Sequence, residues 1–401
     1  MKVDTMRFVD KYAGIPLCTI GTVIKKLFFA SKGKKTPKNI LFIELSEMGS
    51  AILADPAMRK AQKEFNGNLF FLIFKKNKPS LQLLNTVKDE NIFTIDADNL
   101  FSLAKDTLRF FKWARKNKID TVIDLELFSR FTALLSGFCG ADNVVGFHNF
   151  HGEGLYRGAM LTHKVLYNPH HHIAKNFIAM INSLTETSDG KPYSKTKIHD
   201  NELNLAKAEI SEETVKKVKE KIKILYPDYH DEKIVLINPN ASELLPQRRW
   251  DKAKYAKLIK LIADKYPDII ILITGAPSEK KEAQILSEQT GVSKCINFAG
   301  QLKLSELTAL YSISALMVSN DSGPAHFASV TDMPTIVIFG PETPELYKSL
   351  GDTTPVYAAI SCSPCVSAAN HRKTPCTDNV CLQLITEDQV FEQVIKRLDY
   401  A

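Results

Sequence analysis

The sequence lacks the short motifs that mark several large enzyme classes. The 401 residues contain no GxGxxG and no Walker lysine motif. The motifs that normally indicate nicotinamide-dependent chemistry and ATP hydrolysis by a P-loop are therefore absent. HExxH is absent as well. The only DxD triplet is Asp96 and Asp98 in TIDADN, and it resembles a helix cap more than a ligand for a metal-bound diphosphate.

A membrane-spanning run and a secreted disulfide scaffold are also missing. The uncharged segment 13–24 has 12 residues, which is too short to cross a bilayer. Asp4 and Asp10 interrupt the basic start that a signal peptide needs. Seven cysteines in a chain of this length do not suggest a disulfide framework. The sequence therefore predicts a cytoplasmic protein.

The charge pattern indicates a membrane surface rather than nucleic acid as a partner. The net charge of +7 is modest and the lysines are interspersed with acidic residues, so we predict no nucleic-acid binding. The exception is a cluster near the N-terminus: Lys25, Lys26, Lys32, Lys34, Lys35 and Lys38. Apolar residues beside it recur at helical spacing: Ile20, Val23, Ile24, Leu27 and Phe28. Such a basic amphipathic helix either lies on an anionic membrane, peripheral to the inner membrane, or packs on the protein's own surface.

Beyond this arm, two rounds of alternating strands and helices predict an α/β protein with two doubly wound, Rossmann-like domains. The predicted strands are 40–45, 68–74, 92–95, 121–127 and 144–147 in the first round, and 233–240, 268–276, 296–300, 315–321 and 335–340 in the second. Residues 148–232 contain no apolar strand. The predicted boundaries are an arm at 1–37, an N-terminal domain at 38–190, a linker at 191–232, a C-terminal domain at 233–385 and a last helix at 386–401. The carboxyl ends of both sheets should line a shared cleft.

The strongest candidate site is VSNDSGPAH (318–326). An apolar strand ends before Asp321, and Ser322 and Gly323 precede a proline that suits the first position of a helix. Free backbone N–H groups and the helix dipole at such a turn favour a phosphate. His326 lies in the first helical turn. The alternative is a capped helix with a histidine in the core.

Three other strand ends carry polar or glycine residues. Asn238 ends a strand, and Arg248 follows in a loop where a guanidinium could neutralise a leaving diphosphate. Glu279 follows the next strand and could accept ribose hydroxyls. Gly340 ends a third strand in FGPETP. Arg248 and Glu279 also have structural interpretations, as a solvated arginine at a helix start and as a carboxylate that interacts only with the helix dipole.

The joined motifs DSGPAH and PTIVIFGPETP resemble the heptosyltransferase family, glycosyltransferase family 9, and the similarity extends over most of residues 38–395. The resemblance implies a GT-B architecture, a nucleotide diphosphate sugar bound by the C-terminal domain, and a lipid-linked saccharide acceptor, such as a lipopolysaccharide core, bound by the N-terminal domain. It implies catalysis without a metal, and we predict no cofactor.

Residue by residue, the resemblance implies that Asp321 contacts sugar hydroxyls and that Ser322 and Gly323 contact the diphosphate. Arg248 corresponds to a basic residue near the phosphates, and Glu279 to a carboxylate on the ribose. His326 matches the motif histidine. Asn238 and Gly340 complete the predicted donor site.

The chain departs from the family pattern at its opening turn, ELSEMGSA. Better-known members have Gly-Asp with the aspartate as a proposed base, whereas Gly49 is followed here by Ser50. Glu47 is the nearest carboxylate, and an inverting transfer needs a base to take the acceptor's proton. We predict Glu47 as the base and Gly49 and Ser50 on the acceptor side, with Asp124 and Glu126 in reserve.

Two competing functions follow from the same residues. A catalytically degenerate sugar-nucleotide-binding scaffold in envelope polysaccharide assembly would explain the missing aspartate. An NAD-dependent sugar epimerase should show a glycine-rich first turn, which the chain lacks.

Two further clusters leave alternatives open. Cys362, Cys365, Cys376 and Cys381 are compatible with a structural zinc site, with reduced thiols or with disulfides. The triplet His170, His171 and His172 is either a metal ligand set or part of a loop near the acceptor.

Overall fold

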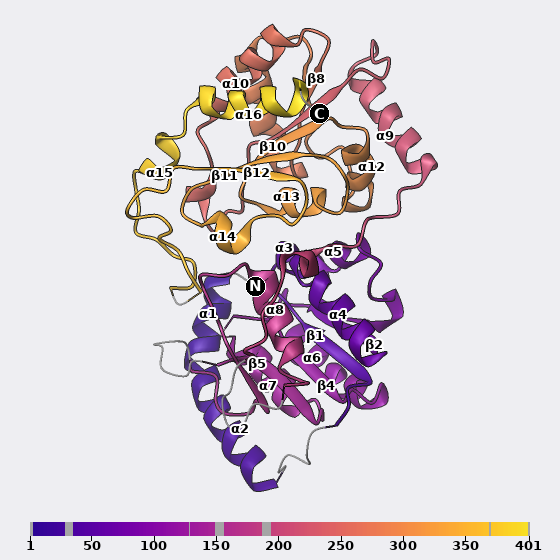
Figure 1. Cartoon of the computed structure of the whole chain (residues 1–401), viewed down its shortest axis with the longest axis vertical. Coiled ribbons are helices and arrows are strands. Elements are labelled where there is room, and N and C mark those ends of the chain that lie inside the picture. The colour runs from indigo at the N-terminus through magenta and orange to yellow at the C-terminus, as the bar shows by residue number, and fades with distance from the viewer. Residues whose placement is uncertain are drawn as a thin grey trace. The chain divides into compact units, whose positions relative to one another are not determined.

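The computed structural model describes residues 3–28, 35–127, 129–148, 156–186, 194–368 and 370–399. Contacts between residues divide the chain into two units, Met1–Ala206 and Lys207–Ala401. Each unit contains one six-stranded sheet with helices around it (Figure 1). The boundaries predicted for the arm, the linker and the last helix remain predictions.

Unit 1 has the strand order β3-β2-β1-β4-β5-β6, and all of its pairs are parallel. The strands are β1 (Asn39–Ile43), β2 (Asn68–Phe74), β3 (Ile92–Ile95), β4 (Thr121–Asp124), β5 (Asn143–His148) and β6 (His163–Leu166). The helices are α1 (Val3–Tyr12), α2 (Gly14–Phe28), α3 (Met48–Leu53), α4 (Asp55–Phe65), α5 (Pro79–Gln82), α6 (Leu100–Lys116), α7 (Arg130–Phe138) and α8 (Ile173–Asn182).

Unit 2 repeats this topology with the order β12-β11-β10-β7-β8-β9, again all parallel. The strands are β7 (Ile234–Asn238), β8 (Ile270–Ile273), β9 (Cys295–Asn297), β10 (Leu316–Asn320), β11 (Thr335–Phe339) and β12 (Thr353–Tyr357). The helices are α9 (Glu212–Leu225), α10 (Lys252–Lys265), α11 (Lys280–Thr290), α12 (Leu307–Ser312), α13 (Gly323–Ala328), α14 (Pro344–Tyr347), α15 (Val380–Gln383) and α16 (Glu387–Asp399).

The predicted fold class is confirmed, because each unit is a doubly wound parallel sheet with the Rossmann strand order. In this order the chain reverses direction across the sheet between β1 and β4 in unit 1, and between β7 and β10 in unit 2. Ligands of such sheets bind outside the carboxyl ends of the strands at this switch point. The residues that follow these four strands are therefore the first place to look for a site.

The prediction that residues 148–232 hold no strand is wrong, because β6 lies there, and β12 was not predicted either. Both are edge strands. In β6 only Val165 is buried, and β12 has no fully buried residue and contains Pro355. A strand with one neighbour and little burial shows no apolar run, and proline is tolerated at a sheet edge.

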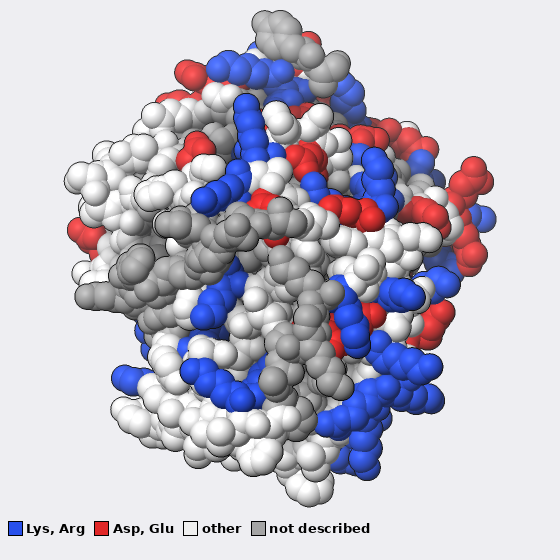
Figure 2. Space-filling view, turned by 60° about the horizontal axis from the view of Figure 1, so that its bottom comes forward, with Lys and Arg blue, Asp and Glu red and all other residues white. Residues whose placement is uncertain are grey.

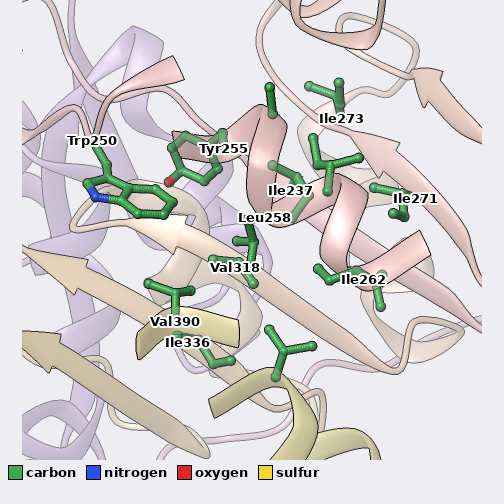
Figure 3. Packing of buried hydrophobic residues seen from close by; sticks show 14 of the residues in the cluster. Ile237, Trp250, Tyr255, Leu258, Ile262, Ile271, Ile273, Val318, Ile336 and Val390 are labelled. Atoms are coloured by element: carbon green, nitrogen blue, oxygen red, sulfur yellow. The ribbon is translucent and has the colours of Figure 1, made fainter. Parts of the chain in front are cut away.

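The core of unit 2 supports the carboxyl ends of β7 and β10. Trp250 and Tyr255 pack edge to face, with ring centroids 4.9 Å apart, and Figure 3 shows them beside the aliphatic side chains of the sheet. The Trp250 indole nitrogen donates a hydrogen bond to the Ile385 carbonyl (3.0 Å). These contacts fix the loop before α10, which carries Arg248. Directly after Ile385, Thr386 and Gln389 form the predicted capping box of α16.

The N-terminal arm is helical, as predicted, and has two different faces. Its small residues pack inward: an added Cβ at Gly21 would lie 3.0 Å from the Phe138 ring, and Cys18 is buried. Large apolar residues face outward, including Leu27 and Phe28, which are 70% and 74% exposed. The arm therefore packs on the protein's own surface, the second of the two predicted alternatives, while leaving an apolar face uncovered. Within the described ranges, no helix has the length and apolar character needed to cross a membrane.

Candidate active site

The carboxyl edge of unit 1 brings the turns after β1 and β4 together. Ile43 of β1 is paired with Asp124 of β4, so the residues that follow the two strands are neighbours. Glu47 lies in extended conformation directly before α3 and does not cap that helix with its side chain. The Ser50 hydroxyl donates a hydrogen bond to Glu47 Oε2 (2.9 Å). Glu47, the predicted base, and Ser50 are thus in direct contact, and Gly49 lies between them in the first turn of α3.

Glu126 binds the turn that leads to Glu47. Its Oε1 accepts hydrogen bonds from the backbone N–H of Leu45 (2.9 Å) and of Ser46 (3.0 Å), and from the Ser46 hydroxyl (2.9 Å). Loss of hydration raises the pKa of Glu126, and the charges of Asp124 and Glu47 raise it further. Glu126 therefore holds the approach to Glu47 in place and lies close to its charge.

Asp124 is structural in this arrangement. Its side chain is completely buried and forms an ion pair with Arg157. Arg157 also donates to the backbone carbonyl of Ser129 (3.0 Å). Because a buried, paired carboxylate is poorly placed to receive a proton from a substrate, Asp124 is a weaker reserve candidate than Glu126.

At the carboxyl edge of unit 2, Asn320 joins β10 to the loop that follows β7. Its side-chain oxygen accepts hydrogen bonds from the Trp250 backbone N–H (3.0 Å) and the Tyr255 hydroxyl (3.0 Å), and its Nδ2 donates to the Pro239 carbonyl (2.7 Å). Asn320 was not among the predicted site residues. Its signal in the sequence was weak, because a lone amide at a strand end has many possible roles.

The turn after β10 places the predicted phosphate-binding residues next to Arg248. Asp321 is 4% exposed, and its Oδ2 lies 3.3 Å from Arg248 Nε. Ser322 directly precedes α13 in extended conformation, and Gly323 opens the helix. His326 is buried in α13. Four of the predicted donor residues thus follow β10, and Arg248 joins them from the loop after β7.

Arg248 is also held by Glu342, which the sequence analysis missed. Glu342 is 1% exposed and its Oε1 lies 3.1 Å from Arg248 Nη2. It follows Gly340 in the turn after β11, which is the neighbour of β10 in the sheet. The guanidinium of Arg248 therefore bridges two buried carboxylates, Asp321 and Glu342. A planar guanidinium fixed on both sides is well oriented to present its remaining N–H groups to an anion.

The other predicted donor residues have structural partners. The Asn238 amide donates to the Thr274 hydroxyl (3.1 Å), linking β7 to β8. One oxygen of Glu279 accepts from the Ala276 N–H (2.6 Å). An added Cβ at Gly340 would lie 2.7 Å from Leu382 Cγ, so close packing is sufficient to require glycine there. Their roles in ligand binding stay predictions.

The cysteine and histidine clusters do not form a metal site in the part of the chain that the structure describes. No group of three His, Cys, Asp or Glu residues is arranged to hold a metal there. All seven cysteines are free thiols. The His172 ring accepts a hydrogen bond from the Ala174 N–H at the start of α8 (3.2 Å), so this member of the triplet acts as a helix cap.

The chain is similar in sequence to known glycosyltransferases. The model of glycosyltransferase family 9 (heptosyltransferase) matches residues 107–374. The lipooligosaccharide heptosyltransferase 2 of Campylobacter jejuni is 28% identical over 177 residues, which are 41% of this chain and 51% of that protein. The chain thus matches about half the length of this curated relative.

Two solved structures share the fold over most of the chain. The ADP-heptose lps heptosyltransferase II of E. coli has a TM-score of 0.68 and 18% identity, covering 90% of this chain and 99% of its own. The E. coli heptosyltransferase WaaC with ADP-2-deoxy-2-fluoro heptose has a TM-score of 0.61 and 17% identity, covering 90% of this chain and 100% of its own. Since the family model spans more than half of the residues, the chain belongs to glycosyltransferase family 9, the heptosyltransferase family.

Proposed function

We propose that this protein transfers heptose or a related sugar from a nucleotide diphosphate, with ADP-heptose favoured, to a lipopolysaccharide-core or other lipid-linked saccharide. The observation that carries the proposal is the turn Asp321–Gly323 beside Arg248, at the switch point of a Rossmann-like sheet in a family 9 chain. Relatives named as lipooligosaccharide heptosyltransferases support the acceptor class. The WaaC structure with an ADP-sugar analogue supports the donor class.

The reaction is an inverting single displacement. An acceptor hydroxyl oxygen attacks the anomeric carbon, the bond from that carbon to the phosphate oxygen breaks, and the nucleoside diphosphate leaves with the electron pair. The hydroxyl proton passes to a protein base. Inversion follows because attack and departure occur on opposite faces of the same carbon.

Glu47 is the proposed base. The Ser50 hydroxyl bond at 2.9 Å holds one of its oxygens, and the turn before it is fixed through Glu126. A carboxylate held in one orientation at the carboxyl edge of the sheet can receive a proton without losing further side-chain freedom. The proposal requires Glu47 to reach the acceptor hydroxyl that attacks the anomeric carbon.

Charge on the departing diphosphate is stabilised by the residues after β10 and by Arg248. The backbone N–H groups of Ser322 and Gly323 act as donors to phosphate oxygens, and the Arg248 guanidinium neutralises the leaving group. Asp321 binds the sugar hydroxyls of the donor, and the Glu279 carboxylate accepts hydrogen bonds from its ribose hydroxyls. These groups are in position before the reaction, so little reorganisation is needed as charge develops.

A second function is favoured by one observation, the serine that follows Gly49. A scaffold that binds the sugar nucleotide without turnover would keep the phosphate turn and would not need a base. Binding of ADP-heptose with no sugar transfer to any lipid-linked saccharide would support this alternative.

The proposed location is the cytoplasmic face of the inner membrane, with the arm lying on the lipid. Phe8 and Tyr12 of α1 are 62% and 61% exposed, and Leu27 and Phe28 of α2 are more so. Lys26 is exposed on the same helix. Figure 2 shows Lys and Arg side chains gathered around an uncharged area on the lower part of the face that it draws. An apolar face flanked by cations suits an anionic bilayer surface.

The experiment that tests the function has two steps. Melting temperatures are measured with ADP-, GDP-, UDP- and dTDP-sugars, because a ligand bound only by the folded chain raises the melting temperature. The donor that binds is then supplied with lipopolysaccharide-core acceptors of different length, and released nucleoside diphosphate is measured. We expect ADP-heptose to raise the melting temperature, and we expect nucleoside diphosphate to be released only when an acceptor is present. If none of the four classes of nucleotide sugar raises the melting temperature, the assignment of the donor site is refuted.

A further inference from the structure

Helix α6 exposes two large apolar side chains on the side that faces away from the sheet of unit 1. Phe101 and Leu108 are 79% and 66% exposed. They lie seven positions apart, which is about two helical turns, so they share one side of the helix. Phe110 lies nine positions after Phe101, on the opposite side, and is buried in the core of unit 1. The exposed pair is therefore not needed for the core and leaves apolar surface in contact with water.

The side chains around this pair are cationic. α6 has five exposed Lys and Arg residues: Lys105, Arg109, Lys112, Arg115 and Lys116. Its one acidic residue, Asp106, is buried, where it accepts a hydrogen bond from the Asp96 backbone N–H (3.0 Å) and pairs with Arg109 (2.8 Å). Neither Lys105 nor Lys112 forms an ion pair with any residue that the structure describes. The outer face of α6 thus combines an apolar centre with a net positive charge.

α6 lies on the same side of unit 1 as the N-terminal arm. Met6 of α1, Phe111 of α6 and Phe131 of α7 pack against one apolar cluster. That cluster includes Leu41 and Val122, which come from the central strands β1 and β4. The two helices therefore cover the same face of the sheet, and their outer sides point away from it. The outer side of α6 is thus available to the surface on which the arm is proposed to lie.

We propose that the outer face of α6 is a second membrane contact, which binds the anionic phospholipid surface of a bilayer. This inference rests on the proposed location at the membrane and adds a contact there. The cations bind lipid phosphates, and Phe101 and Leu108 enter the boundary between headgroups and acyl chains. A membrane fits this face better than a second copy of the chain does. In a symmetric dimer each copy would present the same cations, and like charges would repel.

The test measures co-sedimentation of the full-length chain with vesicles of phosphatidylcholine, with or without phosphatidylglycerol as the anionic lipid. Two double variants probe the α6 face. Lys105→Gln with Lys112→Gln removes two cations, and Phe101→Gln with Leu108→Gln removes the apolar pair. All four side chains are exposed and glutamine is compatible with a helix, so both variants should melt at the temperature of the wild type.

A matched control lies on α9 of unit 2. Ile224 is 77% exposed, and Lys216 is exposed on the same helix. Lys216→Gln with Ile224→Gln removes one cation and one apolar side chain outside the proposed contact. We expect this variant to bind vesicles as the wild type does.

The two α6 variants should lose binding in different ways. The wild type should bind anionic vesicles and dissociate as the salt concentration rises. Loss of two cations should weaken binding to anionic vesicles about tenfold to thirtyfold, and it should not affect binding to neutral vesicles. Loss of the apolar pair should weaken binding at least about tenfold. Both variants should keep wild-type activity on a short soluble acceptor.

The outcomes separate this inference from the function on which it rests. If the wild type binds anionic vesicles and both α6 variants bind them equally well, the α6 contact is refuted and the contact through the arm stands. A dimer that Phe101→Gln with Leu108→Gln converts to a monomer, detected by light scattering, also refutes it, because a second copy then covers the face. If the wild type binds no vesicles, the α6 contact and the membrane location are both refuted. Sugar transfer to a soluble acceptor then decides the proposed reaction separately.

Discussion

Replacing Glu47 by glutamine tests the proposed base with little disturbance of the fold. Glutamine has nearly the same volume, and its amide oxygen can still accept the hydrogen bond that the Ser50 hydroxyl gives to Glu47 (2.9 Å). Glu47 does not cap α3 with its side chain, so the helix start does not depend on the carboxylate. We expect the free energy of unfolding to change by no more than about 0.5 kcal/mol, as for a surface substitution. What the variant loses is the ability to take a proton.

The expected loss of activity is large by comparison. A positioned general base contributes about 10²–10⁴-fold, which corresponds to about 3–5 kcal/mol in the activation free energy. The assay measures kcat and KM for nucleotide release with ADP-heptose and a saturating acceptor. We expect kcat to fall by this factor and KM for the donor to stay close to that of the wild type, because the donor is assigned to unit 2.

Two control variants bracket the result. Glu90→Gln changes an exposed glutamate of unit 1 at the amino end of β3 and should leave kcat unchanged. Ser50→Ala removes the hydroxyl that orients Glu47 but keeps the carboxylate, so its kcat should fall by only about tenfold, the equivalent of one hydrogen bond. A Glu47→Gln enzyme whose kcat is within about threefold of the wild type would refute the assignment of Glu47 as the base.

Three other perturbations test the supporting structure. Burial raises the pKa of Glu126, so the folded chain binds the Glu126 proton more tightly than the unfolded chain does. Protonated Glu126 therefore contributes to the free energy of unfolding at low pH, and this contribution is lost as the pH rises above about 4.3 and through the folded-state pKa. Glu126→Gln cannot ionise, so its stability relative to the wild type should increase as the pH rises above about 4.3. Denaturant midpoints whose difference does not vary with pH would contradict this. Asn320→Ala removes the acceptor of the Trp250 N–H and should lower the free energy of unfolding by about 2–4 kcal/mol, measured by urea titration; a change below about 1 kcal/mol would mean that Asn320 does not hold the loop. Replacing Leu27 and Phe28 together by serine should reduce co-sedimentation with anionic vesicles at least about tenfold, with unchanged activity on a short soluble acceptor, and equal sedimentation would argue against the arm as the membrane contact.

Several candidate residues could be predicted from the sequence because their signals are local. Asp321, Ser322 and Gly323 follow a buried strand and open a helix with a proline, and chain neighbours stay neighbours in any fold. The strand end also predicted Asn238 and Gly340, but it could not show what these residues contact. The partners are Thr274, directly after β8, and Leu382 on α15, and such distant contacts leave no trace in the pattern of either segment.

The sequence by itself determined the family, the two parallel sheets and the strand ends that carry polar residues. Buried parallel strands must be apolar along their whole length, so their ends and the following turns are visible as changes of composition. Only the tertiary structure decided which charges meet. Glu342 brings Arg248 and Arg372 to one oxygen, and Glu126 binds the turn before Glu47. These pairs join segments that are far apart in the chain, and a carboxylate in a sequence does not reveal its partner until packing has brought the two together.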